Sequence, residues 1–304
     1  MSLRPAPDER TPRDRLSFGV VNLDKPPGPS AHEVTAWVRD AAGVDRAAHA
    51  GTLDPKVTGC LPILLGDATR LAQVFLEGAK EYVAVLELHR TAPADTEAVL
   101  AEFETELYQK PPRKSAVRRQ LRRRTVHELE VLDRRERKLL LRIRCESGTY
   151  VRKLCHDLGL ALGTGAHMGN LRRTGTDPFG DTDLVTLHDF VDALAFDDDG
   201  DPEPLAAAVA PAERALRHLP RVVIADSAAR EVAEGAPVYA PGVLSVAAPP
   251  APVTVGDQAT TGPPADGDLV ACLTPDGSVV ALGTLVGDPE ADGGEVVSLE
   301  RVLV

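Results

Sequence analysis

Residues 49–59 read HAGTLDPKVTG, a segment that has neither helical nor strand periodicity and holds a single carboxylate, Asp54. Pro55 biases Asp54 toward an extended conformation and prevents a helix from continuing there. Gly51 and Gly59 permit backbone angles that other residues avoid. Most segments of this kind are ordinary surface turns, since Asp and Pro are common turn residues. The alternative is a stiff loop that presents one carboxylate to a substrate, and the rest of the chain must decide between the two.

The length and composition of the chain limit its class. With 304 residues it is long enough for two or three domains around a sizeable core. It has no apolar run long enough to span a bilayer, so we expect no contact with a membrane. Its four cysteines are far apart and form no CxxC pair, so we expect neither disulfides nor structural zinc, and a reducing cytoplasm fits. Residues 1–17 are polar, lack the apolar core of a signal peptide, and are interpreted as a disordered tail.

Charge is distributed unevenly along the chain. The net charge of −12 alone argues against a nucleic-acid partner. Residues 110–124, however, hold eight Lys or Arg and no acid, whereas residues 221–304 hold twelve acids and three arginines. Charge runs are usually solvated faces, but this contrast favours phosphate binding by the basic segment. An acidic surface with few lysines also suits a high-salt cytoplasm, so we expect a halophilic protein that low salt destabilises.

The order of predicted elements indicates an α+β fold. Hydrophobic patterning predicts strands over 18–23, 60–65, 81–88 and 138–145. It predicts helices over 30–43, 68–76, 96–107, 150–163 and 205–219.

A second domain is predicted at the carboxyl end. From Arg221 onward the composition shifts to short Val-rich strands, the pattern of a small β-barrel or sandwich. We therefore expect one domain over 18–218 and another over 219–304, with a mobile loop at 248–267.

Several familiar chemistries lack their motifs in this sequence. The segment Gly51 to Gly59 does not end in GK[ST], and no GxGxxG follows a strand, so a phosphate loop is not indicated. The histidines are scattered without ligand spacing, so no metal site is expected. No GxSxG-type nucleophile motif occurs.

Two further residues have a functional interpretation beside the ordinary one. Tyr82 stands near the start of a predicted strand, where most tyrosines are half-buried packing residues. Arg152 stands one turn into a predicted helix, where an arginine is normally exposed. If Arg152 faces the Asp54 loop, it would keep that carboxylate ionised and aligned.

Six ordered motifs carry a specific resemblance. They are DKPPG at 24–28, HAGTLDP at 49–55, KEY at 80–82, YQKPP with SAV at 108–117, GTYVR at 148–152, and GAHM with LRR at 165–173. Together they resemble the TruB/dyskerin family of RNA pseudouridine synthases, and the KVTG continuation is similar to its archaeal and eukaryotic branch. Residues 221–304 are similar to a PUA domain, although their acidity differs from the basic patches of RNA-binding versions.

The resemblance implies a fold, an activity and site residues. The fold would be a catalytic domain with a mixed, mainly antiparallel sheet flanked by helices, followed by a small β-barrel PUA domain. Asp54 matches the catalytic aspartate, Arg152 its ion-pair partner, and Tyr82 the aromatic residue that stacks on the flipped base. No cofactor is implied, because the reaction is an isomerisation. Further matched residues would line the pocket or bind RNA: Lys25, His49, Leu171, Arg113, Arg118, Arg119, Arg122 and Arg123.

The resemblance also implies partners, and it leaves alternatives open. The substrate would be the T-loop uridine of tRNA, or ribosomal RNA sites chosen by a box H/ACA guide RNA. The branch implies a kink-turn-binding protein, a Nop-type protein and a Gar-type protein. Asp54 could act as a nucleophile or through a glycal-type intermediate. A different reading is an RNA-binding scaffold that has lost catalysis, against which the presence of Asp54, Tyr82 and Arg152 together argues.

Overall fold

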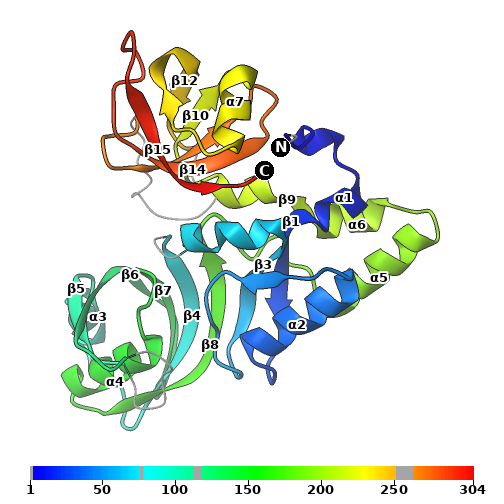
Figure 1. The fold of residues 1–304 in the computed structure, drawn as a ribbon. Helices are drawn as coiled ribbons and strands as arrows, with labels where there is room; N and C mark the ends of the chain where they lie inside the picture. The colour runs from blue at the N-terminus through cyan, green and yellow to red at the C-terminus, as the bar shows by residue number, and fades with distance from the viewer. Residues whose placement is uncertain (1–2, 76–77, 112–117, 251–262) are drawn as a thin grey trace.

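Two β-sheets with helices packed around them form the molecule (Figure 1). The structure is a computed structural model that describes residues 3–75, 78–111, 118–250 and 263–304. The predicted α+β class is confirmed. No helix within these residues has the length and apolar character needed to cross a membrane.

The larger sheet has the strand order β5-β6-β7-β4-β8-β3-β1-β9, with β2 attached to β3. All of its described neighbours pair antiparallel except β3 and β8, which run parallel, so the predicted mixed, mainly antiparallel sheet is confirmed. The strands are β1 (Phe18–Lys25), β2 (Ala47–His49), β3 (Thr58–Gly66), β4 (Lys80–Leu88), β5 (Glu106–Gln109), β6 (Arg122–Arg135), β7 (Lys138–Cys145), β8 (Ala166–Thr176) and β9 (Ala210–Pro211).

The smaller sheet has the order β11-β15-β14-β13-β10-β12. Register shifts in four of its strand pairs bend the strands, which is how a short sheet curls toward a barrel. The chain enters this sheet between β9 and β10, in the region where composition predicts the domain boundary. The expected mobile loop falls largely on residues 251–262, which lie outside the described residues. The strands are β10 (Arg221–Ile224), β11 (Val238–Tyr239), β12 (Val243–Ala247), β13 (Leu269–Leu273), β14 (Val279–Leu285) and β15 (Glu295–Val302).

Helix α2 begins and ends where local sequence signals place it. In α2, the Ser30 side chain accepts from the backbone of Glu33, the Glu33 side chain accepts from Ser30 N, and Gly43 ends the helix with a φ of 64°. The α-helices are α1 (Pro12–Arg15), α2 (Ala31–Ala42), α3 (Thr96–Ala101), α4 (Val151–Ala161), α5 (Leu187–Asp198), α6 (Glu203–Ala208) and α7 (Asp226–Ala233). The 3₁₀ helices are η1 (Pro7–Glu9), η2 (Asp67–Phe75), η3 (Ala212–Leu216) and η4 (Ala240–Gly242).

Two predicted helices end earlier in the structure than expected, and several elements were not predicted. The predicted helix over 205–219 ends at Ala208, because Pro211 disfavours helical angles before it and the chain forms β9 against β1. The predicted helix over 96–107 ends at Ala101, since pairing with β6 draws residues 106–109 into a strand. Strands β6 and β8 and helix α5 are among the elements that have no counterpart in the sequence-based assignment.

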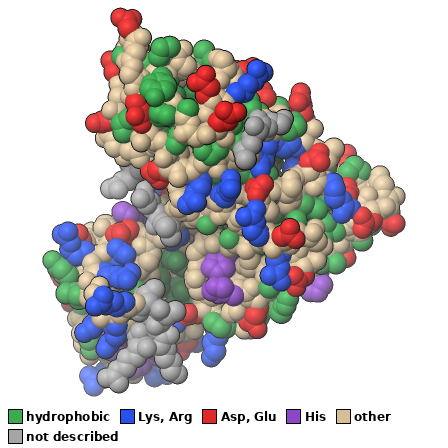
Figure 2. All heavy atoms as spheres, viewed as in Figure 1, with side chains coloured by type: hydrophobic (Ala, Val, Ile, Leu, Met, Phe, Trp, Pro, Cys, Tyr) green, Lys and Arg blue, Asp and Glu red, His purple; other side chains and the backbone are tan. Residues whose placement is uncertain are grey.

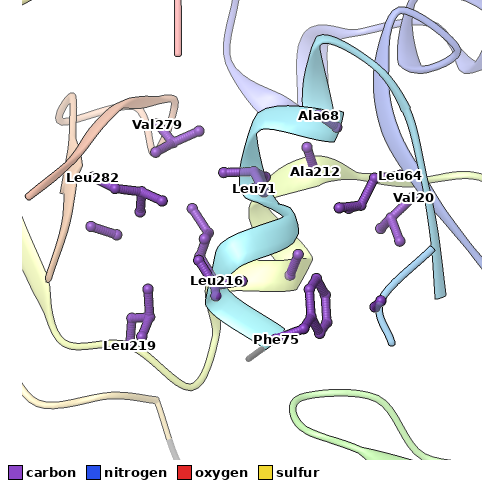
Figure 3. Close-up of a cluster of buried hydrophobic side chains, with 14 of the residues drawn as sticks. Val20, Leu64, Ala68, Leu71, Phe75, Ala212, Leu216, Leu219, Val279 and Leu282 are labelled. Carbon is purple, nitrogen blue, oxygen red and sulfur yellow. The ribbon is translucent and has the colours of Figure 1, made fainter. Parts of the chain in front are cut away.

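Apolar side chains on the two halves of the larger sheet form separate cores. One lies under α2 and α5 against β1 and β3, and the other lies under α3 and α4 against β4, β6 and β7. A further cluster joins η2 and η3 to β14 of the smaller sheet (Figure 3). Its labelled members are Val20, Leu64, Ala68, Leu71, Phe75, Ala212, Leu216, Leu219, Val279 and Leu282. The two sheets therefore share a continuous apolar contact.

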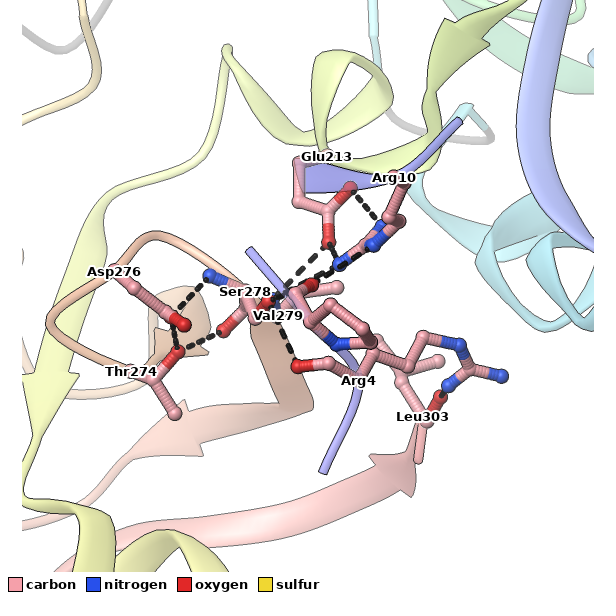
Figure 4. Close-up of polar contacts among 9 residues, drawn as sticks. Arg4, Arg10, Glu213, Thr274, Asp276, Ser278, Val279 and Leu303 are labelled. Carbon is pink, nitrogen blue, oxygen red and sulfur yellow. Dashed lines mark hydrogen bonds and ion pairs between the residues drawn. The ribbon is translucent and has the colours of Figure 1, made fainter. Parts of the chain in front are cut away.

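The amino-terminal segment is ordered, so the predicted disordered tail is wrong for residues 3–17. Arg10 is buried and forms two hydrogen bonds of 2.9 and 2.8 Å with the carboxylate of Glu213, which precedes the smaller sheet. The Arg10 guanidinium also donates to Ser278 Oγ at 3.1 Å, and Arg4 contacts the backbone oxygen of Leu303 (Figure 4). Low hydrophobicity suggested disorder, but these residues are ordered by long-range ion pairs that a local pattern does not reveal.

Candidate active site

Asp54 lies in the loop between β2 and β3. Gly51 and Gly59 adopt φ angles of 93° and 98°, and a Cβ atom at Gly59 would lie 2.2 Å from the backbone oxygen of Arg173. Val57 N donates to the backbone oxygen of Asp54 over 2.9 Å and closes a turn. The loop is therefore held in a defined conformation, and it leaves the Asp54 side chain 53% exposed to solvent.

Lys25 stabilises this loop through hydrogen bonds to its backbone. Its side chain is fully buried at the end of β1, and its ammonium donates to the backbone oxygens of Pro26 (2.9 Å), Pro55 (3.1 Å) and Val57 (2.9 Å). Burial lowers the pKa of Lys25, although the three carbonyl acceptors satisfy its three donors. The resemblance assigns Lys25 to the pocket lining, whereas its charged group points into the loop backbone.

Arg152 forms an ion pair with Asp54, although the two residues stand in distant segments of the chain. The arginine belongs to the first turn of α4, whose start is fixed by Gln109, since Tyr150 N donates to the buried Gln109 Oε1 over 2.8 Å. Both partners are about half exposed, with 51% for Arg152 and 53% for Asp54. A pair of this exposure contributes little to folding, so its main physical effect is to orient the carboxylate.

Tyr82 stands on β4, which β8 separates from β3, the strand that follows the Asp54 loop. Its Cα pairs with that of Arg173 in β8. Burial raises the pKa of Tyr82 to about 12, and the positive charge of Arg173 opposes part of that rise. The tyrosine is therefore neutral near pH 7.

Leu171 lies close to Tyr82 in the fold. Both side chains are partly buried, and each packs against both cores of the larger sheet. They occupy the junction of the two halves of the sheet, while α4 from one half brings Arg152 to Asp54 on the other. The ion pair joins Asp54 and Arg152, and Tyr82 and Leu171 pack against the core that includes Leu53 of the loop.

His49 lies at the start of the Asp54 loop and is paired with a second histidine. Its ring meets that of His32 edge-on, with centroids 4.8 Å apart and an interplanar angle of 86°. Burial lowers the pKa of His49 to about 4, with smaller effects from the charges of His32 and Arg173. The imidazole is therefore uncharged near pH 7, so it offers a flat neutral surface and no positive charge.

The basic segment borders the half of the sheet that holds β5, β6 and β7, where Lys and Arg side chains gather at the lower left of Figure 2. Arg118, Arg119 and Arg123 are exposed, and Arg122 is half-buried. Arg119 donates to the backbone oxygen of Pro111 over 3.1 Å, and Arg123 pairs with Glu106 at 3.3 Å. Arg113 lies outside the described residues.

Sequence reasoning assigned no role to Arg173, whose side chain is 1% exposed and reaches the loop and Tyr82. Its signal would have been the strand register of β8, but no strand was predicted over 166–176. Among residues 3–75, 78–111, 118–250 and 263–304, no group of three or more His, Cys, Asp or Glu side chains has the arrangement of a metal site.

Three family domains match successive parts of the chain. Residues 5–35 match the DKCLD domain, and residues 39–151 match the amino-terminal domain of TruB family pseudouridylate synthases. Residues 152–217 match the carboxyl-terminal domain of tRNA pseudouridylate synthase B. The ordered amino-terminal segment is thus part of a recognised domain.

Curated relatives extend over the whole chain. Proteins of Haloarcula marismortui and Halobacterium salinarum, each named probable tRNA pseudouridine synthase B, are 65% identical over all of this chain and over 94% and 100% of their own lengths. A protein of Pyrococcus abyssi with the same name is 45% identical over 98% of this chain and 87% of its own length. The predicted archaeal and halophilic character is confirmed by these relatives.

Solved structures agree with the sequence relatives. A chain in the crystal structure of a Cbf5-Nop10-Gar1 complex has a TM-score of 0.89 and 44% identity, covering 100% of this chain and 90% of its own. A chain in the structure of an H/ACA RNP bound to a substrate RNA containing 2′-deoxyuridine has a TM-score of 0.87 and 41% identity, covering 99% and 90%. With identity at these levels over its full length, the chain belongs to the TruB family of pseudouridine synthases.

Proposed function

We propose that the protein isomerises uridine to pseudouridine in RNA as the catalytic subunit of a box H/ACA ribonucleoprotein. The observation that carries this proposal is full-length similarity to chains in such assemblies, one of them bound to a substrate RNA. In this mode a guide RNA pairs with ribosomal RNA and delivers the uridine to Asp54. A Nop-type protein, a Gar-type protein and a kink-turn-binding protein complete the particle, which works in the cytoplasm.

The reaction needs one carboxylate and no change of oxidation state. The bond between N1 of uracil and C1′ of ribose breaks, the base turns, and a bond from C5 to C1′ forms. The hydrogen on C5 leaves and N1 gains one, so atoms and electrons balance without a co-reactant. The ionised carboxylate acts either as nucleophile at C1′ or as the base that gives a glycal-type intermediate.

The positions of the site residues support distinct roles. Asp54 acts on the ribose, and Arg152 keeps its carboxylate ionised and aligned. Tyr82 and Leu171 form the apolar surface that the flipped base contacts, since both lie at the junction of the two cores. The neutral ring of His49 suits stacking in the place that the flipped base leaves, and flipping costs a few kcal/mol.

Phosphate contacts come from the arginine run. The exposed arginines 118, 119 and 123 hold the RNA backbone beside the pocket, and the same role falls to Arg113 and Arg122. In high salt the gain from counterion release is small, so stacking and backbone hydrogen bonds carry more of the affinity. The smaller sheet, which shows many acidic side chains in Figure 2, contacts RNA through few groups.

A second mode is guide-free action on the T-loop uridine of tRNA. It is favoured by the relatives at 65% identity, each of which is named a probable tRNA pseudouridine synthase B.

Pseudouridine mapping separates the two modes. The purified protein is incubated with tRNA and with a ribosomal RNA fragment, each alone, with guide RNA, and with guide RNA plus the three partner proteins. The H/ACA proposal predicts that ribosomal product depends on the guide, and the tRNA mode predicts tRNA product without it. Absence of pseudouridine in every mixture containing the full particle would refute the proposed function.

A further inference from the structure

We propose that Arg173 is a positioning residue that ties both ends of the Asp54 loop to the strand that carries Tyr82. The proposal rests on the proposed function, because it concerns the same pocket. Its basis is the set of acceptors around one buried guanidinium, on a residue with no assigned role.

Arg173 is a fully buried arginine without a carboxylate partner, which is unusual. Its side chain is 1% exposed, and it is among the largest fully buried side chains of the described residues. Within the described residues no carboxylate lies within 4.0 Å of its guanidinium. A buried charge without a counterion is unfavourable unless its donors are all used, so its contacts must offset a substantial cost.

Two of these contacts reach the opposite ends of the catalytic loop. Arg173 Nε donates to the backbone oxygen of Cys60 at 2.7 Å, just after the loop, and an Nη donates to that of Gly51 at 3.3 Å, just before Asp54. Gly51 also passes so close that a Cβ atom there would lie 3.4 Å from the other Nη. One side chain therefore sets the separation of the loop ends.

A third relation joins Arg173 to Tyr82. The positive charge of Arg173 opposes part of the rise that burial causes in the pKa of Tyr82, so the guanidinium acts on the phenol. Because Tyr82 and Leu171 pack against both cores of the larger sheet, a shift of this guanidinium changes the surroundings of a base lying on them.

The strand pairing explains why Arg173 can serve both groups. Strand β8 lies between β3 and β4, and the Cα partners of Arg173 are Gly59 on one side and Tyr82 on the other. A shift of Arg173 therefore moves the carboxylate loop and the tyrosine relative to each other. Displacement of reacting groups by about 1 Å can cost about 100-fold in rate.

The test compares Arg173→Met with Arg173→Lys in single-turnover pseudouridine formation, with RNA affinity measured separately by filter binding. We expect Arg173→Met to lower the single-turnover rate about 100-fold, with the RNA dissociation constant within about threefold of wild type. Arg173→Lys keeps the charge and part of the donor set, so it should recover at least tenfold of that loss.

Two controls separate this role from a general effect on folding. Arg144→Met removes another buried arginine, which lies 3.8 Å from Asp177 and has no contact with the loop. It should lower the melting temperature and leave the rate within a few-fold at temperatures where the protein is folded. In a Tyr82→Phe background, Arg173→Met should cost less than it does alone, because the hydroxyl that Arg173 keeps in place relative to the loop is already absent.

The outcomes are distinguishable from failure of the proposed function, because wild type and Asp54→Asn are measured in the same assay. Product from wild type and none from Asp54→Asn supports the function irrespective of Arg173. A folded Arg173→Met protein with the wild-type rate would overturn the inference. So would a loss equal to that of Arg144→Met, or a loss that appears only as weaker RNA binding.

Discussion

Replacement of Arg152 by alanine separates what the Asp54–Arg152 pair does for the fold from what it does for the reaction. The two side chains are 51% and 53% exposed, so solvent screens their attraction in the folded protein. Ion pairs of this exposure contribute about 0–1 kcal/mol to the free energy of unfolding. Arg152→Ala should therefore change stability by no more than about 1 kcal/mol.

The same change should have a large effect on turnover. Without Arg152, the Asp54 carboxylate keeps its backbone position through the loop but loses the group that fixes its rotamer. A misplaced reacting group costs about 100-fold, and the developing charge at the ribose loses its ordered surroundings as well. We expect the single-turnover rate to fall by about 100-fold or more, with RNA binding little changed.

The assay measures single-turnover pseudouridine yield and urea unfolding on the same preparations. Arg135→Ala is the matched control, since Arg135 forms an exposed ion pair with Asp133 at 3.1 Å in the β6–β7 hairpin. It should match Arg152→Ala in stability and wild type in rate. A wild-type rate for Arg152→Ala, or a loss fully explained by unfolding, would refute the assigned role.

Three other perturbations test a buried ion pair, the arginine run and the partly buried His49. Arg10→Met leaves the Glu213 carboxylate buried without its partner and should cost about 3–5 kcal/mol in urea unfolding, whereas Arg10→Met with Glu213→Leu should cost less; equal costs would contradict a buried pair. Replacement of the arginines of the run by serine should raise the RNA dissociation constant and lower its salt dependence by about 0.7–0.9 for each phosphate that is no longer neutralised; an unchanged constant would make the run a solvated face. The changed arginines are Arg118, Arg119, Arg122 and Arg123. Because the folded pKa of His49 is about 4 and the ordinary value is 6.5, the unfolded state binds more protons between these values, so the unfolding free energy should rise with pH there. His49→Phe should remove that slope, and an identical slope in the variant would show that His49 does not cause it.

Parts of the candidate site could be predicted from local sequence signals and from the resemblance. The Asp54 loop could be read from Gly51, Pro55 and Gly59, because these residues restrict or permit backbone angles wherever they occur. The ordered motifs assigned Asp54, Tyr82 and Arg152 to one family pocket, and in the structure Asp54 and Arg152 form an ion pair.

What the sequence did not reveal depends on long-range contacts. Strand β8 carries charged residues along part of its length and lacks the alternation of a half-buried strand, although it lies in the middle of the larger sheet. The burial of Arg173 follows from that position and was missed with it. Residues 3–17 looked disordered for the same reason, since Arg10 is ordered by Glu213, which is distant in the sequence.

The yield of pseudouridine from Asp54→Asn tests most directly whether Asp54 is the catalytic carboxylate. This change keeps the size of the side chain while removing its charge, so the loop and its support by Lys25 should persist. With substrate RNA, guide RNA and partner proteins present, we expect no detectable pseudouridine from a folded variant that still binds RNA. A yield equal to that of wild type would contradict this role.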